Sequence, residues 1–312
     1  MRAIGVAEYG GPDALEVVEL PEPHAGRGEI RLRVHAAAVN PTDTYVRDGS
    51  RAERQRKDPP PYVPGMDAAG VVDEIGEGTD TELHVGDAAM AVVVPDGSHG
   101  AYAEYVVVPA ASAVRAPSGA SAAEAATLPM NAMTARLALD TLALAPGQTL
   151  AVTGAAGALG GYVVQLAKAD RLTVVADASE ADEPLVRELG ADVVVRRGPG
   201  VAQRILGHLP DGVDGVVDAA LLHEQLTPAV RDGGRFVTLR GWTGDGWRGI
   251  EFLPVLAPEH AGDTPMLDRL RRHVEAGVLT LRVAGTLPAE RAAEAHRLLE
   301  AGGIRGRLVL TF

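Results

Sequence analysis

Leu150-Ala-Val-Thr-Gly-Ala-Ala-Gly-Ala-Leu-Gly-Gly-Tyr162 is the most informative segment of this 312-residue chain. An apolar strand runs directly into a turn with glycine at every third position, and an amphipathic helix follows at once. Such a turn lets backbone amides approach a pyrophosphate, whose charge then lies at the N-terminus of the helix. The alternative is a purely structural turn, but an acidic residue about twenty positions on favours nucleotide binding. The candidate cofactor-binding residues here are Gly154, Ala155, Ala156, Gly157, Ala158, Leu159 and Gly160.

The acidic residue is Asp177, at the end of the apolar run 172–177. A carboxylate there accepts hydrogen bonds from the adenosine ribose and repels a 2′-phosphate, although a helix N-cap is an alternative role that Ser179 can equally fill. Arg196 and Arg197 end the next predicted strand, where a guanidinium either reaches a 2′-phosphate, stacks on adenine or is simply solvated. Asp177, Ser179 and Arg197 complete the candidate set for the nucleotide, and both NADH and NADPH remain open.

Strand and helix patterns alternate after residue 118. Strands are predicted at 149–153, 172–176, 192–195, 213–218, 235–239 and 250–255, with helices near 158–170, 181–189, 200–208 and 222–231. This alternation predicts a parallel, doubly wound Rossmann-fold sheet.

The residues before 118 differ in pattern. They predict short strands at 30–39, 70–75, 88–94 and 102–108, bounded by glycine, proline and aspartate. The tail, with helices near 264–277 and 288–301 and strands at 281–286 and 307–311, is assigned to the same β domain. The predicted architecture is therefore α/β with two domains: 1–117 with 258–312 forms the substrate domain, and 118–257 binds the dinucleotide.

Composition excludes several function classes. Hydrophobic residues make up 46% and charged residues 23%, which is typical of a chain that buries a core. The chain has no cysteine, which excludes disulfides, thiol catalysis and cysteine-based zinc sites. The net charge of −13, without a basic face, argues against nucleic acid as a partner. The N-terminus lacks a signal-peptide pattern, and Pro146 and glycines interrupt the uncharged stretch 141–167. A soluble, cytoplasmic protein without a membrane span is expected.

Besides the glycine turn, the chain contains a series of further motifs. They are Val39-Asn-Pro-Thr-Asp43, Pro64-Gly-Met-Asp-Ala-Ala-Gly70, Gly100-Ala-Tyr-Ala-Glu-Tyr105, Leu128-Pro-Met-Asn-Ala-Met-Thr-Ala135, and Glu294-Ala-His-Arg-Leu-Leu-Glu300 with Gly306-Arg307. In these motifs and their order the chain resembles the medium-chain dehydrogenase/reductase superfamily, and most of all its zinc-free quinone oxidoreductase (ζ-crystallin-like) branch. The resemblance implies a GroES-like β-barrel domain beside the Rossmann domain, and a homodimer. It also slightly favours NADPH over NADH, although Asp182 stands where the branch often has a lysine.

Departures from the zinc-dependent relatives concern the metal. Those relatives hold zinc with a cysteine at the position of Asn40 and a His-Glu pair at the position of Met66-Asp67. Neither Asn40 nor Met66 can replace a zinc ligand, so no metal is expected. The histidines form no ligand-spaced pair, and His296 is interpreted as an isolated surface or packing residue.

Without a metal, hydrogen-bond donors must polarise a carbonyl substrate. The resemblance places Asn40, Asp43 and Tyr45 beside the nicotinamide and packs Thr134 against its ring. Tyr45 is chemically the best candidate, because a phenol can donate a proton to a developing oxyanion. The alternatives are a half-buried aromatic for Tyr45, turn and cap chemistry for Asn40 and Asp43, and a helix-interior threonine for Thr134.

The expected activity is hydride transfer from NADPH to a small-molecule quinone or activated α,β-unsaturated carbonyl (enone). Two alternatives stay open. One is an enoyl reductase acting on a biosynthetic intermediate, which uses the same fold and cofactor and differs only in the acceptor. The other is a cofactor-binding protein with little catalytic turnover.

Overall fold

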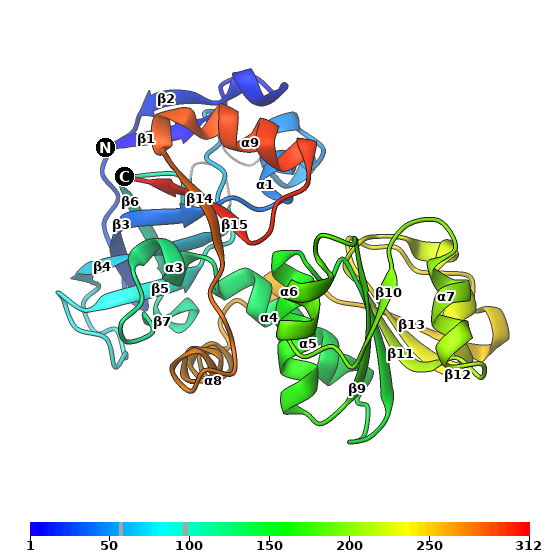
Figure 1. The fold of residues 1–312 in the computed structure, drawn as a ribbon. Helices are drawn as coiled ribbons and strands as arrows, with labels where there is room; N and C mark the ends of the chain where they lie inside the picture. Colours follow the sequence, from blue (N-terminus) through cyan, green and yellow to red (C-terminus); the bar gives the residue numbers. More distant parts are fainter. Residues whose placement is uncertain (56–58, 96–98) are drawn as a thin grey trace. The chain divides into compact units, whose positions relative to one another are not determined.

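The computed structural model describes residues 1–55, 59–95 and 99–312. The chain divides into two compact units, which Figure 1 shows in the colours of the sequence. Unit 1 comprises Met1–Met130, Pro258–Ala276 and Leu281–Phe312, and unit 2 comprises Asn131–Ala257 and Gly277–Thr280. The division after Met130 falls within helix α4 (Pro129–Leu142), later than the boundary expected after residue 117.

Unit 2, all of which is described, is built on a parallel six-stranded sheet in the order β10-β9-β8-β11-β12-β13. The chain starts in the middle at β8, moves outward to β10, and crosses back to β11, so the strand order reverses between β8 and β11. This is the predicted doubly wound sheet, and the fold class is confirmed. Its strands are β8 (Thr149–Thr153), β9 (Thr173–Ala178), β10 (Val193–Arg196), β11 (Val213–Asp218), β12 (Val230–Thr238) and β13 (Glu251–Pro254).

Helices cover both faces of this sheet. Helices α5 (Ala158–Ala169) and α6 (Glu183–Glu188) lie on one face, and α7 (Val201–His208) lies on the other (Figure 1). The strands are rich in valine because parallel strands are buried on both faces. Val175, Val216 and Phe236 accordingly belong to one buried cluster.

One predicted helix of unit 2 is wrong. Residues 222–231 form two short 3-10 helices, η3 (His223–Gln225) and η4 (Thr227–Ala229), before the chain enters β12. Pro228 lies inside the predicted segment and cannot donate a helical hydrogen bond, and His223 has a left-handed φ of 53°.

Unit 1 contains a mixed, mainly antiparallel sheet with the path β14-β15-β3-β4-β5-β7, in which β6 also pairs with β3. A two-stranded ladder, β1-β2, is separate from it. Strand β14 joins this sheet parallel to β15, which assigns the C-terminal tail to the β domain. The strands are β1 (Arg2–Gly5), β2 (Glu16–Glu19), β3 (Glu29–Ala38), β4 (Asp67–Ile75), β5 (Ala88–Val92), β6 (Tyr105–Pro109), β7 (Ala113–Arg115), β14 (Val283–Pro288) and β15 (Arg307–Thr311).

The helices of unit 1 are short or peripheral to its sheet. They are α1 (Asp43–Asp48), α2 (Ala52–Gln55), α3 (Ala122–Ala126), α8 (Thr264–Glu275) and α9 (Ala292–Ala301), with 3-10 turns η1 (Pro12–Ala14), η2 (Ala110–Ser112), η6 (Ala257–His260) and η7 (Ala289–Arg291). A further turn, η5 (Trp247–Gly249), precedes β13 in unit 2. Across the described ranges, no helix combines the length and the apolar character needed to cross a bilayer.

Alanine substitutions at two glycines of unit 2 should change the free energy of unfolding in opposite directions. A Cβ on Gly160 would lie 2.3 Å from the carbonyl oxygen of Gly154, so we expect Gly160→Ala to lower the free energy of unfolding by about 1–3 kcal/mol. Gly207, inside α7, has nothing within 4 Å of such a Cβ. Gly207→Ala should raise the stability by about 0.5–1 kcal/mol. Urea unfolding measures both, and equal effects would contradict the close approach at Gly160.

Candidate active site

Asn40 lies in the turn between β3 and α1, and it is hydrogen-bonded to two buried carboxylates, Asp43 and Asp67. Its backbone N–H donates to Asp43 Oδ2 at 2.7 Å, and its side-chain Nδ2 donates to Asp67 Oδ2 at 2.6 Å. Asn40 is only 2% exposed, and both aspartates are fully buried. The structure therefore brings Asn40 and Asp43 together and adds Asp67 from the start of β4, and their predicted place beside the nicotinamide stays a prediction.

Burial governs the protonation of both carboxylates. It raises the pKa of Asp43 to about 7, although hydrogen bonds from the Asn40 N–H and the Tyr102 hydroxyl act in the opposite direction. Burial likewise raises the pKa of Asp67 to about 6, opposed by the donors on Met130 and Asn40. The Met130 N–H lies 2.6 Å from Asp67 Oδ1. Each carboxylate is thus retained in the interior by donors from several segments of unit 1.

The residues at the metal positions of the zinc-dependent relatives are engaged in hydrogen bonds within the protein. Asn40 and Asp67 share a hydrogen bond, and the Thr42 hydroxyl donates to the sulfur of Met66 at 3.0 Å. In the part of the chain that the structure describes, no group of three or more metal-ligating residues is arranged around one point.

Tyr45 lies on α1, two residues beyond Asp43, and is half-buried. The guanidinium carbon of Arg51 lies 4.8 Å from the centroid of its ring. A cation over the ring face is an attractive contact.

A polar chain that the sequence did not reveal runs inward from helix α9. The Arg47 guanidinium contacts His296 Nδ1 at 3.3 Å and donates to Glu300 at 2.6 Å. His296 Nε2 lies 3.2 Å from the Tyr102 hydroxyl, which donates to Asp43 Oδ2 at 3.0 Å. His296 is buried, as its interpretation as a packing residue allows, but it is not isolated, because folding brings two distant segments to its ring.

The Tyr102 side chain reaches this point because a glycine faces it. Gly65 has a φ of +108°, and a Cβ there would lie 2.6 Å from the Tyr102 ring. The Gly65 N–H also donates to Asp43 Oδ1 at 3.3 Å. Tyr102 and His296 each lie in a sequence motif, Gly-Ala-Tyr at 100–102 and Ala-His at 295–296. Nothing in either motif indicates that the two side chains contact each other.

The glycine turn of unit 2 has the geometry of a phosphate cradle. Gly154 follows β8 with a φ of +63°, and Gly157 is the N-cap of α5 and has no side chain to occupy the amides of the first turn. Gly160 packs so closely on the Gly154 carbonyl that no side chain fits between them. Ala155, Ala156, Ala158 and Leu159 complete this segment between β8 and the first turn of α5.

The acidic residue of the second strand faces this turn. Asp177 is buried near the end of β9, and its Oδ1 accepts a long hydrogen bond of 3.4 Å from the Ala155 N–H. Burial raises its pKa, while the amides of Ala155 and Gly154 and the charge of Arg197 act to lower it. Asp177 and Arg197 therefore lie close enough for their charges to interact, and their roles toward a ribose or a 2′-phosphate stay a prediction.

The remaining nucleotide candidates differ in their contacts. The Ser179 hydroxyl donates to Asp182, so these two side chains satisfy each other. Arg196 pairs with Glu180 at 2.9 Å, whereas the exposed Arg197 guanidinium has no hydrogen bond or ion pair with the described residues. Thr134 is half-buried on α4 and belongs to unit 2.

A second polar group, also missed from the sequence, marks the point where the strand order reverses. Thr153 of β8 donates to Asp218 of β11 at 2.6 Å, and Asp218 accepts the His223 N–H at 2.8 Å. The His223 ring packs on Trp242, with 4.8 Å between centroids. Ligands of doubly wound sheets bind outside the carboxyl ends of the strands at this reversal, which lies beside the glycine turn.

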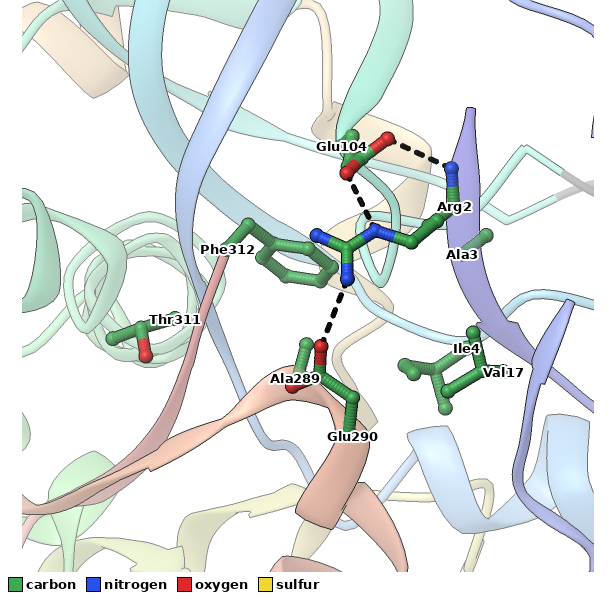
Figure 2. Close-up of a pocket in the computed structure, with 9 residues that line it drawn as sticks. All are labelled: Arg2, Ala3, Ile4, Val17, Glu104, Ala289, Glu290, Thr311 and Phe312. Atoms are coloured by element: carbon green, nitrogen blue, oxygen red, sulfur yellow. Dashed lines mark hydrogen bonds and ion pairs between the residues drawn. The ribbon is translucent and has the colours of Figure 1, made fainter. Parts of the chain in front are cut away.

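A small cavity in unit 1 is a poor alternative to these sites. Its volume is about 130 Å³, whereas pockets for drug-sized ligands have roughly 300–1,000 Å³. Figure 2 shows that the Arg2 guanidinium at its wall is already paired with Glu104 and Glu290. Its charge is therefore satisfied within the protein.

Two family models match the chain. The Alcohol dehydrogenase GroES-like domain matches residues 26–118, and the Zinc-binding dehydrogenase model matches residues 189–310.

Relatives extend this similarity over the whole chain. The NADPH-dependent alkenal/one oxidoreductase of Arabidopsis thaliana chloroplasts is 30% identical over 323 positions, covering 99% of this chain and 79% of that protein. The quinone oxidoreductase of Lama guanicoe is 42% identical over 82 residues, 25% of this chain and only 23% of its own length. The solved structure of an NAD-dependent alcohol dehydrogenase is 32% identical and superimposes with a TM-score of 0.88 over 100% of both chains.

The buried imidazole predicts a pH-dependent stability. Burial, assisted by the Arg47 charge, lowers the pKa of His296 to about 3, against about 6.5 in an unfolded chain. Below pH 6.5 the unfolded state therefore binds a proton that the folded state refuses, so the contribution of His296 to stability is lost as the pH falls. Relative to His296→Leu, the wild type should lose about 1.4 kcal/mol per pH unit between pH 6 and 4. Denaturant titrations at several pH values measure this difference, and a constant difference would refute the prediction.

Proposed function

The chain belongs to the medium-chain dehydrogenase/reductase superfamily, and from this membership we propose that it transfers a hydride from NADPH to a quinone or an activated α,β-unsaturated carbonyl. The observation that carries the proposal is the glycine turn after β8, beside the reversal of the strand order. The names of the alkenal/one and quinone oxidoreductase relatives support this acceptor class. The homodimer expected from the resemblance stays a prediction.

The residues of the turn fit a dinucleotide. Gly157 leaves the first amides of the 12-residue helix α5 uncapped by a side chain, and a pyrophosphate satisfies such amides while its charge interacts with the helix dipole. The tight contact between Gly160 and Gly154 keeps the helix against the strand, so the backbone amides would reach the phosphates of a bound dinucleotide directly. When bound, the cofactor supplies the hydride, and the protein supplies orientation and electrostatics.

We assign cofactor selection to Arg197. Its guanidinium is exposed and near Asp177, and a planar donor group of this kind binds a phosphate in a bidentate manner. Asp177 by itself would favour the ribose hydroxyls of NADH. The Arg197 charge offsets that carboxylate, and the NADPH dependence named for the Arabidopsis relative agrees with this assignment.

Tyr45 is proposed to hold the proton that neutralises the reduced acceptor. Its phenol is only half-buried, whereas Asn40 and Asp43 use their polar atoms within the buried network. We therefore assign Asn40 and Asp43 to supporting the turn before α1. Enoyl reduction of a biosynthetic intermediate would use the same residues and differs only in the acceptor offered.

Turnover tests both the reaction and the tyrosine. Loss of reduced-nicotinamide absorbance is followed with an ortho-quinone and with an enone, each with NADPH and NADH and with enzyme-free controls. Tyr45→Phe should lower kcat by roughly 100- to 1000-fold, because a positioned donor contributes about that much.

The matched control is Tyr105→Phe. Tyr105 also lies under an arginine, with Arg31 at 4.9 Å from its ring centroid, but it begins strand β6. We expect this control to retain wild-type kcat. Full activity of Tyr45→Phe would remove Tyr45 from the mechanism, and cofactor binding without any oxidation would indicate a non-catalytic binding protein.

Cofactor preference is tested at Arg197. Arg197→Gln should raise the KM for NADPH by roughly 10- to 100-fold, because it removes one charged hydrogen-bonding partner of the 2′-phosphate. The KM for NADH should stay unchanged. Arg196→Gln is the control, because Arg196 is held by Glu180. Equal changes for both cofactors would show that Arg197 does not contact the 2′-phosphate.

A further inference from the structure

Helix α1 is too short to fix its own orientation. It has six residues, Asp43–Asp48, and its N-cap Thr42 makes no capping hydrogen bond with its side chain. Isolated helices shorter than about 12 residues are marginal in water, because nucleation is unfavourable. The direction of each α1 side chain is therefore determined by what the helix packs against.

Two residues on one face of α1 are attached to the interior. Asp43 and Arg47 are one turn apart, and both are buried. Tyr45 is two residues from each, roughly 200° around the axis, and so lies on the opposite side of the helix. Fixing the face of Asp43 and Arg47 thereby fixes the direction of Tyr45.

The partners of this face come from helix α9 and from the segment before β6. His296 and Glu300 are also one helical turn apart, and both contact Arg47. Tyr102 links His296 to Asp43 and packs edge-on against the imidazole, with 5.9 Å between centroids. Helices α1 and α9 are thus linked at two points, directly at Arg47 and through Tyr102 at Asp43.

The hydrogen bonds that link Arg47, His296, Tyr102 and Asp43 all run in one direction from donor to acceptor. Arginine can only donate, so Nδ1 of the neutral His296 accepts from Arg47 and the ring proton lies on Nε2. His296 Nε2–H then donates to the Tyr102 oxygen, and the Tyr102 O–H donates to Asp43. Each hydrogen bond polarises the next, and the series ends on a carboxylate.

We propose that His296 and Tyr102 are positioning residues: the chain Arg47–His296–Tyr102–Asp43 fixes the rotation of α1 and so directs the Tyr45 phenol toward the acceptor. This inference rests on the role proposed for Tyr45. The Tyr102 hydroxyl is fully buried. It therefore affects turnover only through the position of Tyr45.

Tyr102→Phe tests the proposal, because it removes one oxygen and keeps the ring packing. Hydrogen exchange of amides 40–48 is measured by mass spectrometry, with Tyr105→Phe as the matched control. We expect exchange in this segment to rise by roughly 10-fold or more in Tyr102→Phe and to stay unchanged in the control. Should Tyr102→Phe fail to fold, His296→Leu breaks the same chain at its next atom.

Kinetics supply the second readout. Tyr102→Phe should lower kcat with little change in the KM for NADPH, and Tyr45→Phe/Tyr102→Phe should be no slower than Tyr45→Phe alone, since both changes act through one phenol. Multiplicative losses, or unchanged exchange at 40–48, would overturn the positioning role. If Tyr45→Phe proves fully active, the proposed mechanism fails, while the exchange measurement still decides whether the chain orders α1.

Discussion

Asp43 and Asp67 carry carboxyl groups into the interior of unit 1, and the organisation of the site follows from the donors that they require. An unpaired buried carboxylate is very costly, so each must be surrounded by N–H and O–H groups. These donors come from the β3–α1 turn, from Gly65, from Tyr102 and from the start of α4. Satisfying two carboxylates thus ties together segments that are far apart in the sequence.

The glycine turn of unit 2, proposed to bind the cofactor, depends on a different physical requirement. It relies on backbone amides and on the absence of side chains, so the requirement is steric. Gly160 and Gly154 approach so closely that no side chain fits between helix α5 and the turn after β8. The proposed selection between cofactors lies at the edge of this turn, where Asp177 and Arg197 carry charges of opposite sign. In the proposed function, the general affinity for a dinucleotide and the choice between two dinucleotides therefore depend on separate residues.

Much of this fold was predictable because its signals are local. Strand β8 and helix α5 follow from apolar runs and glycine spacing within about twenty residues, and the doubly wound class is confirmed. The helix predicted over 222–231 failed because Pro228 and the left-handed backbone at His223 outweighed an apolar pattern. Asn40 and Asp43 were selected by resemblance, and their burial against Asp67 was not predictable from it.

By itself the sequence determined the family, the glycine turn between strand and helix, and the lack of cysteine ligands, since these depend on residue type and short spacing. Only the tertiary structure decided that His296 and Tyr102 meet Asp43, and that Thr153 meets Asp218. Those contacts join residues separated by 59 to 194 positions. A hydrogen bond depends on distance in space and on excluded water, and neither is encoded in the local pattern around a single residue.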